Sequence, residues 1–419
     1  MKKYKALLIL LMVALIGLVG VTAYSDYKVN KNDKTKKYAS NNEITTSKKE
    51  KTTKKEKDTT KEPVTTEKKE EKKVVTLVSV GDNLIHTPLL DEGLQPDGSY
   101  DFHFLFEIML DDFKSADLAI INQESVIGGP ELGYDGYPNF NSPNEVADCI
   151  EEAGFDVVLH ASNHAMDVGV DGIKNSIAYW KNKKDITMLG FNETAQEAYK
   201  ARYVEKNGIK FAMFNFTYGL NGYTLPADED YLVNLLDDAH KEQIVNEIKE
   251  AKNNSDFVIA FPHWGNEDWL KDVSDFQIQW ANILTDAGVD LIIGTHPHVL
   301  EKIEWINTEA GNKSLCYYSV GNYISNQQEL NEVLGGMAKV TIVKENGKTY
   351  IDETATGIVP TVTQNDRTGA KPLIQTYHLT DYTEEMAAIH DIKRRFDGSF
   401  SAARLNQTAQ DVLGDWIIE

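Results

Sequence analysis

The sequence predicts an α/β domain with mixed β-sheets, and three observations support this fold class. Short apolar runs alternate with amphipathic segments between residues 74 and 293, which is the pattern of strands connected by helices. Hairpin signals occur at Asn207-Gly208 and Asn346-Gly347, because Asn-Gly suits a tight turn between antiparallel strands. Several apolar runs also end in a polar residue, as strands do when their ends carry functional side chains.

The individual elements follow from hydrophobic period and from start and stop residues. Expected strands cover residues 74–80, 117–122, 157–160, 187–190, 199–206, 209–216, 257–261, 291–293, 302–306, 314–320 and 336–343. Expected helices cover residues 102–114, 143–153, 171–183, 238–252, 275–287, 384–396 and 402–416. The helix at 143–153 has Ser142 as a plausible N-cap and Gly154 as its stop.

Residues 1–25 are expected to direct the protein to the membrane. Lysines in the first five residues precede an uncharged apolar run at 6–23, which predicts a signal anchor with the following domain outside the cytoplasm. The run is slightly shorter than the roughly 20 residues of a full span. Cleavage at Val21-Thr22-Ala23 would instead release a secreted protein, and the lack of a following Cys excludes a lipoprotein anchor.

Residues 26–73 are rich in Lys, Glu and Thr and read as a disordered stalk, because they contain too few apolar side chains for a core. Residues 1–73 have a net charge of +9 and residues 74–419 a net charge of −31. So acidic a domain argues against nucleic-acid binding. The stalk lysines favour anionic lipid headgroups or an anionic wall polymer, or they simply keep the stalk soluble.

The remainder divides into a main domain at 74–330 and a segment at 331–419. Hairpins and helices in the latter either complete the domain or are appended to it. Cys149 and Cys316 are the only cysteines, and both are expected in the core. Two cysteines exclude a disulfide scaffold, and the sequence leaves open whether they pair.

The segment Gly294-Thr295-His296-Pro297-His298 follows a buried apolar run and is the clearest functional signal. Two imidazoles two residues apart at a strand end can bind one metal ion. Two ordinary loop histidines would be the alternative for an isolated His-x-His. Four other apolar runs also end in metal-type residues, which makes a shared site the better interpretation. The predicted metal ligands are Asp82, Glu124, Asn163, His164, His263, His296 and His298.

Imidazoles outnumber carboxylates in this set, so one or two ions of Mn, Zn or Fe fit it better than Ca. Asn163 and His164 are also the catalytic candidates, since an amide can bind a phosphate oxygen and an imidazole can donate a proton. His86, Glu267 and Asn322 are possible additional members. His86 is a ligand, a substrate contact or neither, Glu267 orients a ligand or contacts substrate, and Asn322 is more readily explained by a structural turn.

These segments resemble those of the CapA/PgsA-type poly-γ-glutamate capsule proteins, within the calcineurin-like metallophosphoesterase superfamily. The resemblance runs from about Val75 to Ile324. It rests on Val80-Gly81-Asp82, Asn122-x-Glu124, Ser162-Asn163-His164-Ala165-Met166-Asp167-x-Gly169, Pro262-His263-Trp264-Gly265, Gly294-x-His296-Pro297-His298 and Ser319-x-Gly321-Asn322. It implies a four-layer αββα sandwich of two mixed sheets, a two-metal centre and an anchored, extracytoplasmic protein of capsule polymer synthesis and export.

Two positions depart from the superfamily pattern. Leu84 stands where the superfamily has a histidine, and Glu124 stands where it has a bridging Asp. These departures leave three alternatives for one metal position: it is short of a ligand, it is filled by His86, or it binds its ion weakly.

Two kinds of function remain open. The first is a metal-dependent hydrolase acting on a phosphoester or amide of the cell envelope. The second is a non-catalytic polymer-binding component of a membrane complex that makes or exports poly-γ-glutamate. The expected partners are this or another anionic envelope polymer, membrane lipid, and the membrane subunits of the synthesis complex.

Overall fold

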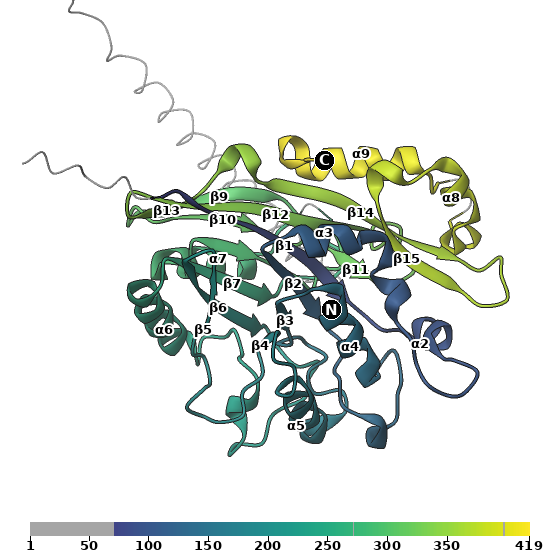
Figure 1. The fold of residues 1–419 in the computed structure, drawn as a ribbon, viewed down its shortest axis with the longest axis horizontal. Coiled ribbons are helices and arrows are strands. Elements are labelled where there is room, and N and C mark those ends of the chain that lie inside the picture. Colours follow the sequence, from purple (N-terminus) through teal and green to yellow (C-terminus); the bar gives the residue numbers. More distant parts are fainter. Residues whose placement is uncertain (1–70, 271, 397–398) are drawn as a thin grey trace, which may run out of the picture. The chain divides into compact units, whose positions relative to one another are not determined.

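The computed structural model describes residues 71–270, 272–396 and 399–419. Within these residues the chain forms two mixed β-sheets with helices on their outer faces (Figure 1), so the expectation of an α/β fold with two mixed sheets is confirmed. The helices are α2 (Thr87–Gly93), α3 (Leu110–Ser115), α4 (Asn144–Ala153), α5 (Gly169–Trp180), α6 (Lys241–Asn254), α7 (Asp275–Ala287), α8 (Glu384–Ile389) and α9 (Ala402–Leu413).

The larger sheet has the order β15-β14-β12-β1-β2-β3-β4, with β11 also paired to β1 and β13 to β12. Strands β1 to β4 are parallel, whereas β12, β14 and β15 add antiparallel partners. Its strands are β1 (Lys73–Asn83), β2 (Leu118–Gln123), β3 (Val157–Leu159), β4 (Thr187–Leu189), β11 (Asn322–Ile324), β12 (Leu334–Glu345), β13 (Lys348–Ile351), β14 (Gly357–Asp366) and β15 (Leu373–His378).

The smaller sheet has the order β5-β6-β7-β8-β10-β9. Strands β6, β7, β8 and β10 are parallel, and antiparallel pairs close both edges. The hairpin predicted at Asn207-Gly208 is confirmed and joins β5 to β6. Its strands are β5 (Arg202–Lys206), β6 (Ile209–Thr217), β7 (Phe257–His263), β8 (Leu291–Ile293), β9 (Ile303–Asn307) and β10 (Lys313–Tyr317).

The two sheets share one apolar core, and alternation along the strands divides their side chains between two faces. In β1, Val75 and Leu77 join the core between the sheets, while Val78 and Val80 face helices α2 to α4. In β6, Phe211 joins the core between the sheets, and its neighbours Ala212 and Phe214 face α6 and α7. The layers therefore follow the order helices, sheet, sheet, helices.

Residues after 331 complete the larger sheet. Strand β12 pairs with β1 from Lys73↔Lys344 to Val80↔Met337, and the hairpin predicted at Asn346-Gly347 joins it to β13. Buried side chains of α9, including Leu405 and Leu413, extend the core between the sheets. This packing ties the C-terminal segment to the first strand of the domain.

The predicted anchor at 1–25 and nearly all of the predicted stalk at 26–73 lie outside the described residues. Strand β1 begins at Lys73, one residue before the expected start. In the part of the chain that the structure describes, no helix combines the length and the apolar character that a bilayer span requires. Cys149 and Cys316 are both free and buried, each within a hydrophobic cluster, as core residues should be.

Three predictions of local structure were wrong. The helix expected at 384–396 ends at Ile389, because His390 is extended (φ −62°, ψ 133°), and a separate 3-10 helix follows at Asp391–Arg394. The helix expected at 102–114 is divided into two short 3-10 turns and α3, because its aromatic side chains take separate partners; Phe106, for example, stacks on Tyr323 with ring centroids 5.7 Å apart. Ser142 does not cap α4: its hydroxyl lies 2.8 Å from that of Ser125, and Pro143 occupies the N-cap. Gly154 ends this helix as expected, in the left-handed conformation with φ 95°.

Glu301 is a buried acid on the connection from β8 to β9. One carboxylate oxygen accepts a 2.6 Å hydrogen bond from Gln277 Nε2, whereas the other has no partner. Gln277 is held in turn by the capping box that starts α7 at Ser274. Burial raises the pKa of Glu301 to about 8, so the folded protein favours its protonated form.

This acid makes stability depend on pH. Its folded pKa lies above its unfolded value of 4.5, so its contribution is complete below pH 4.5 and is lost as the pH rises to about 8. Glu301→Gln keeps the hydrogen bond and removes the titration. We expect its free energy of unfolding to exceed that of the wild type by a margin that grows from pH 5 to pH 8, at up to ~1.4 kcal/mol per pH unit, and thermal melts at each pH measure this as a growing difference in melting temperature. A constant difference across this range would contradict the assignment.

Candidate metal centre

The predicted ligands meet at one edge of the domain, where parallel strands of both sheets end. Asp82 lies near the end of β1, Glu124 follows β2, Asn163 and His164 follow β3, His263 ends β7, and His296 and His298 follow β8. Side chains at the carboxyl ends of neighbouring parallel strands point to the same region. Residues far apart in the sequence therefore share one site, as the hydrogen bond of 3.2 Å from the His296 N–H to Asp82 shows.

Three overlapping groups have ligand atoms within 4.8 Å of one another: Glu124 with His263 and His296, Asp82 with Glu124 and His298, and Glu267 with His296 and His298. Glu124 belongs to two of them. Its Oε1 lies 3.5 Å from His263 Nε2 and 3.8 Å from His298 Nε2, so the carboxylate stands between two imidazoles. This is the arrangement expected of a carboxylate that contacts two cation positions.

The polar atoms of this cluster support a metal-binding role. Both carboxylate oxygens of Glu124 are buried without a hydrogen-bond partner, and so are Nδ1 of His296 and Oδ1 of Asn122. Leaving such atoms buried and unsatisfied costs free energy, most of all for a carboxylate. A divalent ion coordinated by these atoms would remove this cost. The set of imidazole and carboxylate donors therefore fits the transition metals expected from the sequence.

The electrostatics of the cluster also favour a cation. Burial works against ionisation of His298, but the neighbouring Glu124 and Asp82 carboxylates outweigh it and raise the pKa of His298 to about 10. Burial would raise the pKa of Glu124, yet the surrounding imidazoles lower it well below its ordinary value. The pKa of His296 shifts in the direction opposite to that of His298, because burial and the neighbouring His263 lower it. The effect of Glu124 and Asp82 on His298 shows that these carboxylates stabilise a positive charge placed beside them.

Backbone geometry holds the two central histidines in unusual conformations. His296 has φ 97° and His298 has φ 59°, both in the left-handed region that non-glycine residues seldom occupy. A Cβ on the preceding Gly294 would lie 2.0 Å from the carbonyl oxygen of Tyr318, so only glycine allows this close approach. Strained residues persist where the surrounding structure requires them, and they concentrate at functional sites.

Asn163 and His263 lie in direct contact. The amide oxygen of Asn163 is 2.9 Å from His263 Nε2, and His263 Nδ1 is 2.9 Å from the Thr295 hydroxyl. The His263 ring, the Asn163 amide and the Thr295 side chain are all buried. Thr295 is thus a positioning residue that the sequence interpretation had passed over, although it lies within the Gly-x-His-x-His segment.

His164 lies beside the cluster rather than inside any of its three groups. Its Nδ1 is 2.7 Å from Asp167 Oδ2, and the ring lines a cavity of about 430 Å³ next to His298. Burial works against the charged form, but the bond to Asp167 raises the pKa of His164. Asp167 was visible in the sequence motif without a role, and the structure gives it one as the partner of this imidazole.

The three additional candidates have different positions. Glu267 lines the cavity and belongs to one metal group. His86 lines the same cavity but joins none of the groups, and burial lowers its pKa to about 4. The interpretation of Asn322 as a turn residue was wrong: it starts β11, and its Oδ1 lies 3.1 Å from His298 Nδ1 because β11 pairs with β1 at Asp82.

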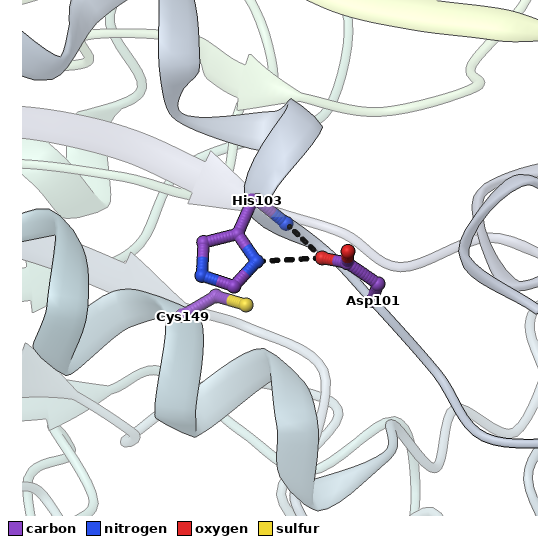
Figure 2. A group of neighbouring side chains, drawn as sticks. All are labelled: Asp101, His103 and Cys149. Carbon is purple, nitrogen blue, oxygen red and sulfur yellow. Dashed lines mark hydrogen bonds and ion pairs between the residues drawn. The ribbon is translucent and has the colours of Figure 1, made fainter.

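A second cluster of metal-type residues is better explained as an ion-pair network. Asp101, His103 and Cys149 lie together on another part of the domain (Figure 2). His103 Nδ1 is 2.6 Å from Asp101, and its Nε2 is 2.6 Å from Glu152. These bonds raise the pKa of His103, and burial raises the pKa of Cys149 to about 12. Both nitrogens of His103 are thus already engaged by carboxylates, and a thiol that stays neutral is a poor metal ligand.

Two mixed sheets whose parallel strands end at one cluster of metal-type side chains define the class of this domain. Residues 76–327 match the model of the family described as bacterial capsule synthesis protein PGA_cap. The chain belongs to this family.

Curated relatives match a shorter part of the chain. The PGA biosynthesis protein CapA of Bacillus subtilis is 35% identical over 184 residues, which cover 44% of this chain and 46% of the relative. The capsule biosynthesis protein CapA of Bacillus anthracis is 29% identical over 190 residues, covering 45% of this chain and 44% of the relative. The alignments therefore span less than half the length of these relatives.

Among solved structures, the calcineurin-like phosphoesterase YfkN of Bacillus subtilis is 12% identical to this chain, with a TM-score of 0.38. That match covers 82% of this chain and 97% of the solved chain.

The metal assignment predicts that the purified full-length protein contains roughly one to two divalent transition-metal ions per chain. Glu124→Gln and His298→Ala should lose most of this metal, because each removes a ligand from a buried group. The matched control His103→Ala should retain it. Elemental analysis measures the metal content, and circular dichroism confirms folding. A folded Glu124→Gln protein with the wild-type metal content would contradict the site, as would loss of the metal from His103→Ala alone.

Proposed function

We propose that this protein is a membrane-anchored, extracytoplasmic component of poly-γ-glutamate capsule biosynthesis or export that acts through the metal site at the strand ends. The observation that carries the proposal is the fully buried, unpartnered carboxylate of Glu124 among His263, His296 and His298. Membership of the PGA_cap family and the names of the curated relatives support the biological process. The basic and apolar N-terminal sequence supports the location.

The cavity beside the cluster suits a substrate whose negative charge is met by a metal. Among the described residues, its lining includes His86, His164, Glu267 and the polar side chains of residues 326–328, but no lysine or arginine. The domain from residue 74 has a net charge of −31, and at physiological salt its repulsion of a polyanion extends over roughly 8 Å. The side chains that line the cavity provide too little positive charge to bind an anionic group, so a metal ion would have to supply it.

The residues would divide the work as follows. Asp82, Glu124, Asn163, His263, His296 and His298 would hold one or two ions of Mn, Zn or Fe. A bound ion would supply Lewis acidity toward a phosphoryl or carbonyl oxygen. Nδ1 of His164 is hydrogen-bonded to Asp167, so Nε2 is the nitrogen left for a group in the cavity. This imidazole can therefore give or take a proton at Nε2. Phe140 packs edge-on against the same ring and fixes its orientation.

Two functions of the site are compatible with this geometry. In the first, the protein is a hydrolase of a phosphoester or amide bond in the envelope, with His164 as the proton donor. In the second, the metal and the residues lining the cavity bind the polymer without cleaving it. The His164–Asp167 pair is the specific observation that favours the first, because a grip alone does not require a buried imidazole oriented by a carboxylate.

A cellular experiment tests the proposed process. Glu124→Gln and His298→Ala should abolish capsule polymer, because the metal centre is the proposed positive focus for the anionic chain. His103→Ala, matched in residue type and outside the site, should leave the polymer at the wild-type level. Immunoblots of membrane fractions establish that each variant is present and anchored. Normal polymer in cells whose variant is folded but free of metal would contradict the proposal.

An activity measurement separates the two functions. The full-length protein, supplied with Mn, Zn or Fe, is assayed against phosphodiester substrates and γ-glutamyl oligomers. For a hydrolase, Asp167→Asn should lower kcat by about 10²-fold or more, because it removes the carboxylate charge that favours a proton on His164 while the metal remains bound. The absence of turnover by the metal-loaded wild type, together with normal polymer binding, would leave the polymer-gripping function.

A further inference from the structure

A second pocket lies in the C-terminal segment, beyond the part of the chain that matches the family model. It has a volume of about 420 Å³ and lies between the turn after β14 and the short 3-10 helix after α8. Arg367 and Thr368 line one side of this basic pocket, and residues 388–391, Lys393 and Arg394 line the other. The strand β14, which leads to Arg367, is an integral part of the larger sheet.

The basic pocket has an excess of positive charge. Asp391 is the only acid among the described residues that line it, and it pairs with Arg367 at 3.4 Å and also with Arg394. One carboxylate neutralises only one of these guanidiniums, and Lys393 adds a further charge. His390 adds none, because burial lowers its pKa to about 4 and its ring is held between the Thr363 carbonyl and the Ile392 N–H.

Two described acids lie next to the pocket without lining it. Glu329 pairs with Arg395 at 3.5 Å, and the carboxylate of Asp366, which accepts a hydrogen bond from the Thr368 N–H, lowers the positive charge nearby. The described lining itself still has Arg367, Lys393 and Arg394 against the single carboxylate of Asp391. Burial and the nearby guanidinium of Arg394 lower the pKa of Arg367, and the two guanidiniums share the one carboxylate of Asp391. The domain as a whole has a net charge of −31 and repels anions, whereas this cluster of basic side chains attracts them locally.

A single residue connects the basic pocket to the cavity at the metal centre. Arg367 Nη2 donates a 2.6 Å hydrogen bond to Asn326 Oδ1, which also accepts one from Asn365. Asn326 lines the central cavity, and its backbone N–H donates to His86 Nδ1 at 3.2 Å. The two pockets are therefore neighbours, separated by the side chain of Asn326.

We infer that the basic pocket is a carboxylate-binding subsite for the stretch of γ-linked glutamate polymer adjacent to the unit held in the central cavity. This inference rests on the proposed function and gives its polymer a second point of attachment. Guanidinium and ammonium groups form charge-assisted hydrogen bonds with carboxylates. A polymer that occupies two neighbouring subsites gains affinity because the second contact is intramolecular. Two separate contacts would hold a polyanion against the repulsion of the domain.

The experiment measures binding of a fluorescent γ-glutamate decamer to the full-length protein by anisotropy at several salt concentrations. Lys393→Gln/Arg394→Gln should bind about tenfold more weakly than the wild type, equivalent to ~1.4 kcal/mol, and with less dependence on salt. The matched control Lys241→Gln/Lys249→Gln removes the same charge from α6 and should bind as the wild type does. Lys393→Gln alone should weaken binding in the same direction and leaves the ion pairs of Arg394 intact.

Several results would overturn the inference. One is unchanged decamer affinity in the Lys393→Gln/Arg394→Gln protein when its melting temperature is that of the wild type. Another is an equal loss in the α6 control, which would indicate a general charge effect. A third is loss of binding to a polyphosphate chain of equal charge with decamer binding unchanged, which would identify a phosphate site. Metal content is measured in every variant, so failure of this subsite remains distinct from failure of the metal centre.

Discussion

The arrangement at the strand ends depends on one electrostatic constraint, the burial of the Glu124 carboxylate without a hydrogen bond. Burying a charged group in that position costs several kcal/mol of folding free energy unless positive charge surrounds it. His263 and His298 approach one carboxylate oxygen at 3.5 and 3.8 Å, close enough for attraction and too far for good hydrogen bonds. Such spacing leaves room for an ion between the groups. The same carboxylate lowers the free-energy cost of placing a cation nearby. Because Glu124 comes from the larger sheet and the histidines beside it from the smaller one, it connects the ligands of both sheets.

The fold provides this constraint by joining two sheets at the carboxyl ends of their parallel strands. Each sheet alone holds only part of the ligand set: Asp82 and Glu124 come from the larger sheet, and the three clustered histidines come from the smaller one. The shared apolar core fixes the sheets against each other, and the contact of His298 with Asp82 and Asn322 joins them at the site. The residues after 331 strengthen the arrangement, because β12 pairs with β1 along most of its length.

Much of the fold and of the site could be predicted from the sequence, because both depend on local patterns. The strand at 291–293 and the helix at 275–287 have the expected bounds, since each has a clear period and clear end signals. The strand ends also indicated which side chains converge. Contacts between distant segments could not be read in this way. Asn322 appeared to be a turn residue because its pairing with β1 is a tertiary feature.

The C-terminal segment shows the same limit. Strand β14 was missed because Pro360 interrupts a pattern that otherwise favours a strand, and the β14–β15 pairing overrides this local signal. The basic pocket was missed with it, since Arg367 and Arg394 meet only when β14 and the turn after α8 are both in place. A charge count by segment cannot detect such a cluster in an acidic domain.

The central claim is that Glu124 and the clustered histidines bind a metal ion. Anomalous diffraction from crystals of the manganese-loaded protein, recorded on both sides of the manganese edge, tests it most directly. The account predicts a peak within the cluster formed by Asp82, Glu124, His263, His296 and His298. A well-ordered structure with this cluster free of anomalous signal, or with the peak at His103 and Cys149, would contradict it.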